Sequence, residues 1–222
     1  MKAIILAAGK GVRMRPLTYE TPKSLIKIKG KPVIEHIFES LPSDISEVIV
    51  VVKHLGDRIK EYLGDEFKGR RVTFVEGSEK GTAYSFLAAK PHLTGEFLVL
   101  YGDEFPQSED VRRCLKQGLS AITFTSHNPK LHGMASLRSD GTIAEIVEKP
   151  ENFEGKMAVG GIMVLNEKIF NYSPYPNSKG EYYLTSLLNQ FIKDHRVMAV
   201  PSSNFIGDIT TPADLERVEK LI

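Results

Sequence analysis

The chain has 222 residues, of which 41% are hydrophobic and 26% charged, and its formal net charge is +1. This length and composition suit one domain with a sizeable core, and the balanced charge gives no indication of a nucleic-acid or membrane surface. The single cysteine, Cys114, excludes an internal disulfide and a multi-cysteine metal site, and it favours a reducing, cytoplasmic location. No apolar run approaches the roughly 18 residues of a membrane helix, and the apolar run at residues 3–8 is too short for a signal peptide.

The first half of the chain alternates between short apolar strands and amphipathic helices. Residues 2–6 form a continuous apolar segment followed by glycines, as expected for a buried strand of a parallel sheet. The pattern predicts further strands and helices at 32–41, 47–52, 55–63, 72–75, 81–90, 97–101, 108–117 and 119–125. Such an alternation predicts an α/β fold, a Rossmann-like, doubly wound, mainly parallel sheet covered on both faces, with ligands beyond the carboxyl ends of the strands.

The second half has a different pattern and predicts a small β subdomain. Residues 134–137 and 143–147 flank Asp140-Gly141 and are typical of a hairpin. Further elements are expected at 158–165, 181–193, 197–200 and 212–222. We interpret residues 1–222 as a single domain, in which 127–222 form a substrate-binding half on the same sheet as 1–126.

A glycine-rich loop follows the first strand. Gly9 and Gly11 allow backbone N–H groups to approach a phosphate or a base, and Arg13 and Lys23 supply two cations that could clamp a triphosphate. The loop is not a dinucleotide-binding GxGxxG motif, because Met14 occupies the place of the third glycine, and no Gly-Lys-Ser/Thr follows to make it a P-loop. Taken alone, a glycine turn with solvated cations is the more common interpretation.

Seven motifs, however, resemble those of the sugar-1-phosphate nucleotidyltransferase family, and they occur in that family's order. The first is LAAGKGVRMRPLT with PKSL after it, which contains the glycine loop and both cations. The others are GTA at 81–83, YGDE at 101–104, EKP at 148–150, GGI at 160–162, GEYYLT at 180–185 and DITTP at 208–212. The resemblance implies an enzyme that joins a nucleoside triphosphate to a sugar 1-phosphate, giving an NDP-sugar and pyrophosphate.

The resemblance also implies a role for individual residues. Asp103 and Asp208 would bind Mg²⁺, and the catalytic residues would be Arg13, Lys23 and Asp103. The implied nucleotide-binding residues, all within 1–126, are Leu6, Ala7, Ala8, Gly9, Gly11, Glu76, Gly81 and Thr82. The implied sugar-phosphate-binding residues, all within 127–222, are Glu148, Lys149, Gly161 and Glu181.

The chemistry of these residues agrees with such a reaction. A phosphate monoester has a second pKa of about 6, so the nucleophile is already ionised and no general base is required. Charge neutralisation and in-line positioning are required instead, and carboxylates with cations supply them. Plainer interpretations exist: Asp208 could cap a helix, Lys149 could be a surface lysine, and Glu181 could favour a helix N-terminus.

The six histidines show no metal-ligand spacing, and we interpret them as structural or surface residues.

Two departures from the family pattern bear on specificity. Glu76 stands where the family has a base-reading glutamine, and an ionised carboxylate only accepts hydrogen bonds. It could accept from cytosine or guanine amino groups, so it favours CTP or GTP over UTP or dTTP; a shift of register would instead leave it a solvated strand end. Thr210 and Ser186 replace Gly and Asp of two motifs and weaken any inference about the sugar.

Three alternatives stay open at this level. One is a cytidylyltransferase that acts on a non-sugar phosphate, such as phosphocholine or an inositol phosphate. Another is a non-catalytic NDP-sugar-binding regulatory subunit, and the third is a nicotinamide-dependent oxidoreductase. Without a hexapeptide repeat after residue 212, the chain looks like a short stand-alone member of the family. The expected partners are an NTP and a sugar 1-phosphate, with no nucleic acid or membrane, and a homo-oligomer is possible.

Overall fold

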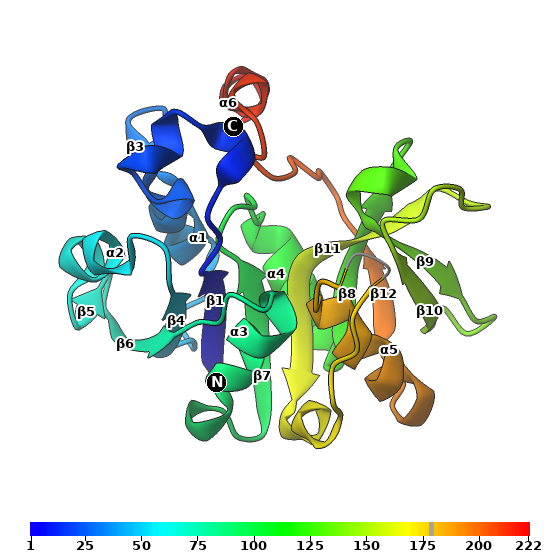
Figure 1. Cartoon of the computed structure of the whole chain (residues 1–222). Coiled ribbons are helices and arrows are strands. Elements are labelled where there is room, and N and C mark those ends of the chain that lie inside the picture. Colours follow the sequence, from blue (N-terminus) through cyan, green and yellow to red (C-terminus); the bar gives the residue numbers. More distant parts are fainter. Residues whose placement is uncertain (178–179) are drawn as a thin grey trace.

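The computed structural model describes residues 1–177 and 180–222, and its centre is a ten-stranded sheet (Figure 1). Four parallel strands lie side by side in its middle: β6 (Arg70–Glu76), β4 (Glu47–Val52), β1 (Lys2–Ala7) and β7 (Glu96–Tyr101). Most of their side chains are apolar, and those of β1, β4 and β7 are largely buried. Because their carboxyl ends share one edge of the sheet, the loops that follow them can meet there.

Helices cover both faces of this sheet, as the alternating side chains of β1 require. Ala3 and Ile5 belong to one core cluster, and Ile4 and Leu6 to the other. The first cluster is completed by α1 (Val33–Ser40), α2 (Gly56–Leu63), α4 (Ser108–Gln117) and α6 (Pro212–Glu219), and the second by α3 (Thr82–Ala88) and α5 (Leu184–Asp194). The expected doubly wound α/β fold class is confirmed.

Beyond β7 the sheet becomes mixed. The long strand β11 (Met157–Asn166) pairs antiparallel with β7 and separates it from β8 (Ser120–Thr125), although β8 follows β7 and α4 in the chain. β8 in turn pairs parallel with β12 (Met198–Pro201). The register of β11 against β8 shifts between Val159 and Met163, a stretch that contains Gly160 and Gly161. This irregularity lies where β11 passes from the subdomain into the main sheet.

The predicted hairpin is present and forms one end of the sheet. β9 (Gly133–Leu137) and β10 (Ile143–Glu148) pair antiparallel, and β9 continues onto the first part of β11. The side chain of Asn189 in α5 accepts a hydrogen bond from the Ile146 N–H at 2.8 Å and donates to its carbonyl at 2.5 Å. The amide thereby covers part of an exposed strand edge.

Several short elements lie in segments for which no periodicity predicted them. They are β2 (Lys27–Ile28), β3 (Lys31–Pro32), β5 (Glu66–Phe67) and the 3₁₀ turns at Val12–Met14, Leu17–Tyr19, Lys23–Leu25, Lys90–His92, Pro129–Leu131 and Glu167–Asn171.

Two helix boundaries differ from the prediction by three residues: α5 begins at Leu184 and not at Glu181, and α6 ends at Glu219 and not at residue 222. Residues 181–183 are held away from the helix, because Tyr182 pairs with the start of α3: its carbonyl accepts the Ala83 N–H at 3.0 Å, and its N–H donates to the Lys80 carbonyl at 3.3 Å. In the described part of the chain, every helix is too short or too polar to span a membrane.

Candidate active site

A cleft of about 500 Å³ opens at the carboxyl ends of the parallel strands. The glycine loop after β1, the ends of β6 and β7, the segment after β10 and the segment before α5 all contribute to its walls. Most of the sequence-predicted site residues line it: Leu6, Ala7, Ala8, Gly9, Arg13, Lys23, Gly81, Thr82, Asp103, Glu148, Lys149, Glu181 and Asp208. Residues as far apart in the chain as Leu6 and Asp208 therefore share one cavity.

An acidic and cationic cluster lies where β7 ends. Lys23 Nζ is 2.5 Å from Asp103 Oδ2, and its side chain is only 14% exposed. The segment that carries Asp208 runs alongside: the Ile209 N–H donates to the Asp103 carbonyl at 3.0 Å, and Glu104 and Asp208 form an antiparallel bridge. The two predicted metal ligands thus come from neighbouring extended segments of the same cleft wall.

Asp208 is not a helix cap. The N-cap of α6 is Thr211, which forms a capping box with Asp214, so the plainer interpretation of Asp208 is wrong. The Thr210 hydroxyl, which stands where the family has glycine, donates to the Asp208 carboxylate. Arg217 donates to the Asp208 carbonyl at 2.8 Å and fixes the backbone. Asp208 therefore lines the cleft while Arg217 holds its backbone.

The residues could hold a hard divalent cation only together with a substrate. Among the described residues, no cluster of three or more His, Cys, Asp or Glu side chains could bind a metal. Asp103 and Asp208 supply two carboxylates at one wall, and Mg²⁺ commonly uses one or two carboxylates plus substrate phosphates. The donor set therefore fits Mg²⁺ bound with a triphosphate better than a metal bound by protein alone.

Glu104 lines the cleft next to the predicted residue Asp103, and sequence reasoning did not single it out. Its carboxylate accepts the Gly161 N–H at 2.7 Å and lines the cleft. Burial, with the nearby charges of Asp103 and Asp208, raises the pKa of Glu104 to about 8. A Cβ at Gly161 would lie 2.8 Å from the Glu104 carboxyl carbon and 2.8 Å from the Tyr101 ring, so only glycine fits. Gly161 itself lies behind the cleft lining, and its neighbour Gly160 lines it.

A second polar group of the cleft comes from the segments after β10 and before α5. Lys149 Nζ is 3.1 Å from the Tyr183 hydroxyl and 4.3 Å from the centre of that ring. Tyr183 donates to Glu181 Oε2 at 2.8 Å, and Thr185 donates to Glu148 Oε2 at 2.8 Å. Lys149 has φ of +46°, a left-handed conformation uncommon for a lysine and typical of a constrained site.

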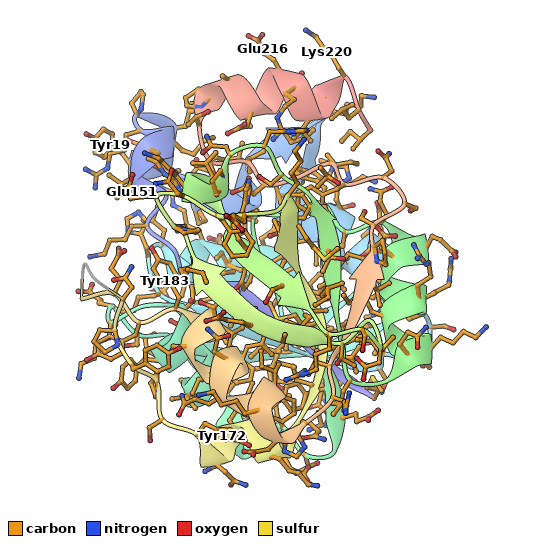
Figure 2. All side chains as sticks on the ribbon, turned by 90° about the vertical axis from the view of Figure 1, so that its right-hand side faces the viewer. Tyr19, Glu151, Tyr172, Tyr183, Glu216 and Lys220 are labelled. Carbon is orange, nitrogen blue, oxygen red and sulfur yellow. The ribbon has the colours of Figure 1, made fainter. Side chains whose placement is uncertain are left out.

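Burial governs the protonation of this second group. It raises the pKa of the Glu148 carboxyl and, together with the hydrogen bond to Glu181, that of the Tyr183 hydroxyl. The Lys149 ammonium lies over the face of the Tyr183 ring and next to the carboxylate of Glu148. Tyr183 is labelled beside the start of α5 in Figure 2. Tyr183 and Thr185 belong to the GEYYLT motif, but neither had been singled out as a site residue.

Gly81 explains how the segment before α5 packs beside the start of α3 at the edge of the cleft. Its φ is +124°, and a Cβ would lie 2.4 Å from the Tyr182 carbonyl oxygen. The extended 181–183 segment can therefore pack on the start of α3 only because residue 81 is glycine. Thr82 completes the contact, since its hydroxyl accepts the Leu184 N–H at 2.9 Å.

Two predicted nucleotide-binding residues lie outside the cleft lining. The Gly11 carbonyl accepts the Thr18 hydroxyl at 2.7 Å, which shapes the loop from behind. Glu76, at the end of β6, is 67% exposed and pairs with Lys53 at 2.7 Å; Lys53 lines the cleft and Glu76 does not. The structure therefore supports Lys53, rather than Glu76, as the member of this ion pair that faces the cavity.

His132 is a further cleft residue that sequence reasoning missed. It lies between the 129–131 turn and β9 and lines the cleft, contrary to the interpretation of all six histidines as structural or surface. Burial lowers the pKa of its imidazole. No spacing signal could have found it, because a single histidine reaches the cavity and its neighbours in space are far away in sequence.

These features define an α/β protein whose cleft, at the carboxyl ends of parallel strands, combines cations and carboxylates suited to phosphate groups. The model of the nucleotidyl transferase family matches residues 2–221, so the chain belongs to that family. The resemblance drawn from the seven motifs is confirmed, and the oxidoreductase alternative falls away.

Individual relatives agree with this membership. The chain is 32% identical over 225 residues to the bifunctional protein GlmU of Methanocaldococcus jannaschii, covering 100% of this chain and 54% of that protein. It is 28% identical over 232 residues to the UTP–glucose-1-phosphate uridylyltransferase AglF of Haloferax volcanii, covering 99% and 96%. The chain thus spans about half the length of the bifunctional relative and nearly all of the other.

A solved structure shares the fold. The crystal structure of a putative glucose-1-phosphate thymidylyltransferase from Bacillus anthracis, in complex with a sucrose, superimposes with a TM-score of 0.85 at 27% identity. The match covers 100% of this chain and 94% of that one. The mixed sheet with its inserted antiparallel strand is therefore an architecture found among these enzymes.

Proposed function

We propose that this protein is a nucleotidyltransferase that converts an NTP and a sugar 1-phosphate into an NDP-sugar and pyrophosphate. The observation that carries the proposal is the meeting of Lys23, Asp103 and Asp208 in one part of a cleft that Lys149 also lines. Family membership and the relatives' names support the same reaction.

Residues 1–126 would bind the nucleotide. The glycine loop Ala7–Gly9 offers backbone N–H groups, and Arg13 and Lys23 offer charge to the β- and γ-phosphates. Lys23 is already held beside Asp103, so it needs no large rearrangement to reach a triphosphate bound there. As the Pα–O–Pβ bond breaks, these two cations would stabilise the leaving pyrophosphate.

Residues 127–222 would bind the acceptor. The Lys149 ammonium would hold the ionised phosphate of the sugar 1-phosphate, while Glu148 and Glu181 would accept hydrogen bonds from sugar hydroxyls. One oxygen of that phosphate then attacks the α-phosphorus, forming the new P–O bond. No protein base is needed, because this oxygen carries its charge before the reaction.

Asp103 and Asp208 would hold Mg²⁺. Bound with the triphosphate, the ion would neutralise charge that builds up during transfer. Asp103 would at the same time keep Lys23 in place through their ion pair.

Base choice rests on the end of the cleft near β6. The preference for CTP or GTP that Glu76 suggests stays a prediction. Lys53 already donates to one carboxylate oxygen of Glu76, which leaves the other oxygen to accept from a base. We also propose a cytoplasmic location, since the substrates are nucleoside triphosphates and the one cysteine is a buried thiol.

The test is pyrophosphate release from each of the four NTPs and dTTP with Mg²⁺, offered with glucose 1-phosphate, N-acetylglucosamine 1-phosphate, phosphocholine or inositol phosphate. Release with a sugar 1-phosphate supports the proposal. Release with only phosphocholine or inositol phosphate would favour the non-sugar alternative. Tight NDP-sugar binding in calorimetry without any release would favour a regulatory subunit.

A further inference from the structure

His132 lines the same cleft as Lys149 and Asp208. It is the one histidine of the described chain that lines the cavity. The charges of both Asp208 and Lys149 act on its imidazole, which places the ring within electrostatic range of each. In the proposed reaction, the acceptor phosphate must pass through this region, since it is held by Lys149 and attacks a phosphorus near Asp208.

Two contacts with separate segments of the chain hold His132 in place. Its carbonyl accepts the Lys149 N–H at 3.0 Å, which joins it to the constrained backbone of that lysine. Its ring stands edge-on to Phe124, with centres 5.0 Å apart and an interplanar angle of 89°. Phe124 stacks on Phe205 at 3.5 Å, and Phe205 precedes Asp208 by three residues. The imidazole is therefore preorganised relative to the groups on either side.

Neither ring nitrogen has a hydrogen-bond partner among the described residues, in contrast to His36 and His54, whose Nε2 atoms contact the carbonyls of Ile28 and Thr18. The ring lines the cleft, and its nitrogens are not among the buried polar atoms that lack a partner. They can therefore exchange a hydrogen bond to water for one to a ligand. Burial lowers the pKa of the imidazole and so favours its neutral form, in which one ring nitrogen donates and the other accepts. A neutral donor can bind a phosphate oxygen without adding charge beside Lys149.

We propose that His132 binds the acceptor directly, donating a hydrogen bond from its imidazole N–H to the phosphate oxygen of the sugar 1-phosphate that Lys149 also holds. This inference rests on the proposed function. It assigns the acceptor end of the cleft a neutral donor next to a cation, a combination that recognises a phosphate monoester. Removing the imidazole should weaken acceptor binding and leave nucleotide binding unaffected.

The kinetic test compares H132F with H132Q and with H127F. Phenylalanine keeps the aromatic contact with Phe124 and removes both nitrogens, glutamine restores an N–H donor, and His127 is exposed and lies outside the cleft. With glucose 1-phosphate, or the acceptor of the panel that turns over fastest, H132F should raise the acceptor KM about tenfold. The KM for the NTP should change less than twofold, H132Q should recover part of the loss, and H127F should match the wild type.

Proton NMR of the histidine ring signals tests the contact itself. The His132 signal, identified by its absence in H132F, should shift when the same acceptor is added, while the signals of the other histidines stay in place. If the wild type releases pyrophosphate but H132F keeps its acceptor KM and the signal does not move, the inference is wrong and the proposed function stands. If the wild type releases none with any pair, the proposed function fails and this inference falls with it.

Discussion

Replacing Lys23 by methionine separates a catalytic role from a structural one. Methionine has a similar length and no charge, so the change removes the ion pair with Asp103 and little packing. The Asp103 side chain is 34% exposed, and water can therefore solvate its carboxylate once Lys23 is gone. For such a partly exposed pair, we expect a loss of about 1 kcal/mol in the free energy of unfolding.

The expected effect on catalysis is larger. If Lys23 stabilises the leaving pyrophosphate, its loss should cost about 3 kcal/mol in the transition state, or roughly a hundredfold in kcat. A stability loss of about 1 kcal/mol lowers Tm by only about 2–4 °C in a chain of this size and leaves almost all molecules folded at 25 °C. Activity and stability should therefore respond very differently to this substitution.

The assay is pyrophosphate release at saturating substrates, paired with a thermal melt of the same samples. The matched control is K27M, since Lys27 is an exposed lysine four residues later and lies outside the cleft; it should keep wild-type kcat. An active K23M enzyme, within threefold of the wild type, would refute the assignment of Lys23 to the triphosphate.

Three further predictions concern specificity and stability. E76Q should shift the outcome of a competition among all four NTPs and dTTP towards UTP or dTTP, because an amide can donate to a base carbonyl; an unchanged product ratio would remove Glu76 from base selection. D110A should lower stability by about 3 kcal/mol, and hence Tm by roughly 6–12 °C, since Asp110 is 2% exposed and accepts from the Ser202 hydroxyl at 2.5 Å and from the Ser203 N–H at 3.0 Å; a shift below 2 °C would contradict this. T211A should cost about 1 kcal/mol at neutral pH, as measured by urea unfolding. Burial raises the pKa of Asp214, but hydrogen bonds from Thr211 and from the N–H of Thr210 have the larger effect, so its pKa is lowered in the folded state. The stabilisation by these hydrogen bonds is therefore present above about pH 4 and should fade as the pH falls through the folded pKa.

The sequence predicts the elements of this fold better than their arrangement. Apolar periodicity is a local property, and it indicated the strands 2–6, 47–52 and 97–101 within about a residue at each end. The insertion of β11 between β7 and β8 depends on pairing between segments far apart, which periodicity does not encode. The start of α5 was misplaced for the same reason, since a contact with the 80–83 segment holds residues 181–183 extended.

The site shows the same division. The resemblance of the motifs to the family predicted Arg13, Lys23, Asp103, Lys149 and Asp208, and all five line one cleft. The arrangement of parallel strands accounts only for the loop after β1 and for Asp103 after β7, which meet at one edge of the sheet. The raised pKa of Glu104 and the place of His132 could not be predicted, because each depends on burial by residues from three separate segments. Glu76 is the opposite case: its motif position predicted a site residue, but it pairs with Lys53 and does not line the cavity.

Binding of a divalent cation by Asp103 and Asp208 together with a triphosphate is the claim on which the proposed function depends most. Electron paramagnetic resonance with Mn²⁺ and an α,β-methylene NTP, which cannot release pyrophosphate, measures it directly in the wild type, D103N and D208N. We predict one tightly bound Mn²⁺ per chain in the wild type, and its loss in both variants while their melting temperatures stay within a few degrees. Undiminished Mn²⁺ binding in both variants, or none in the wild type, would contradict the account.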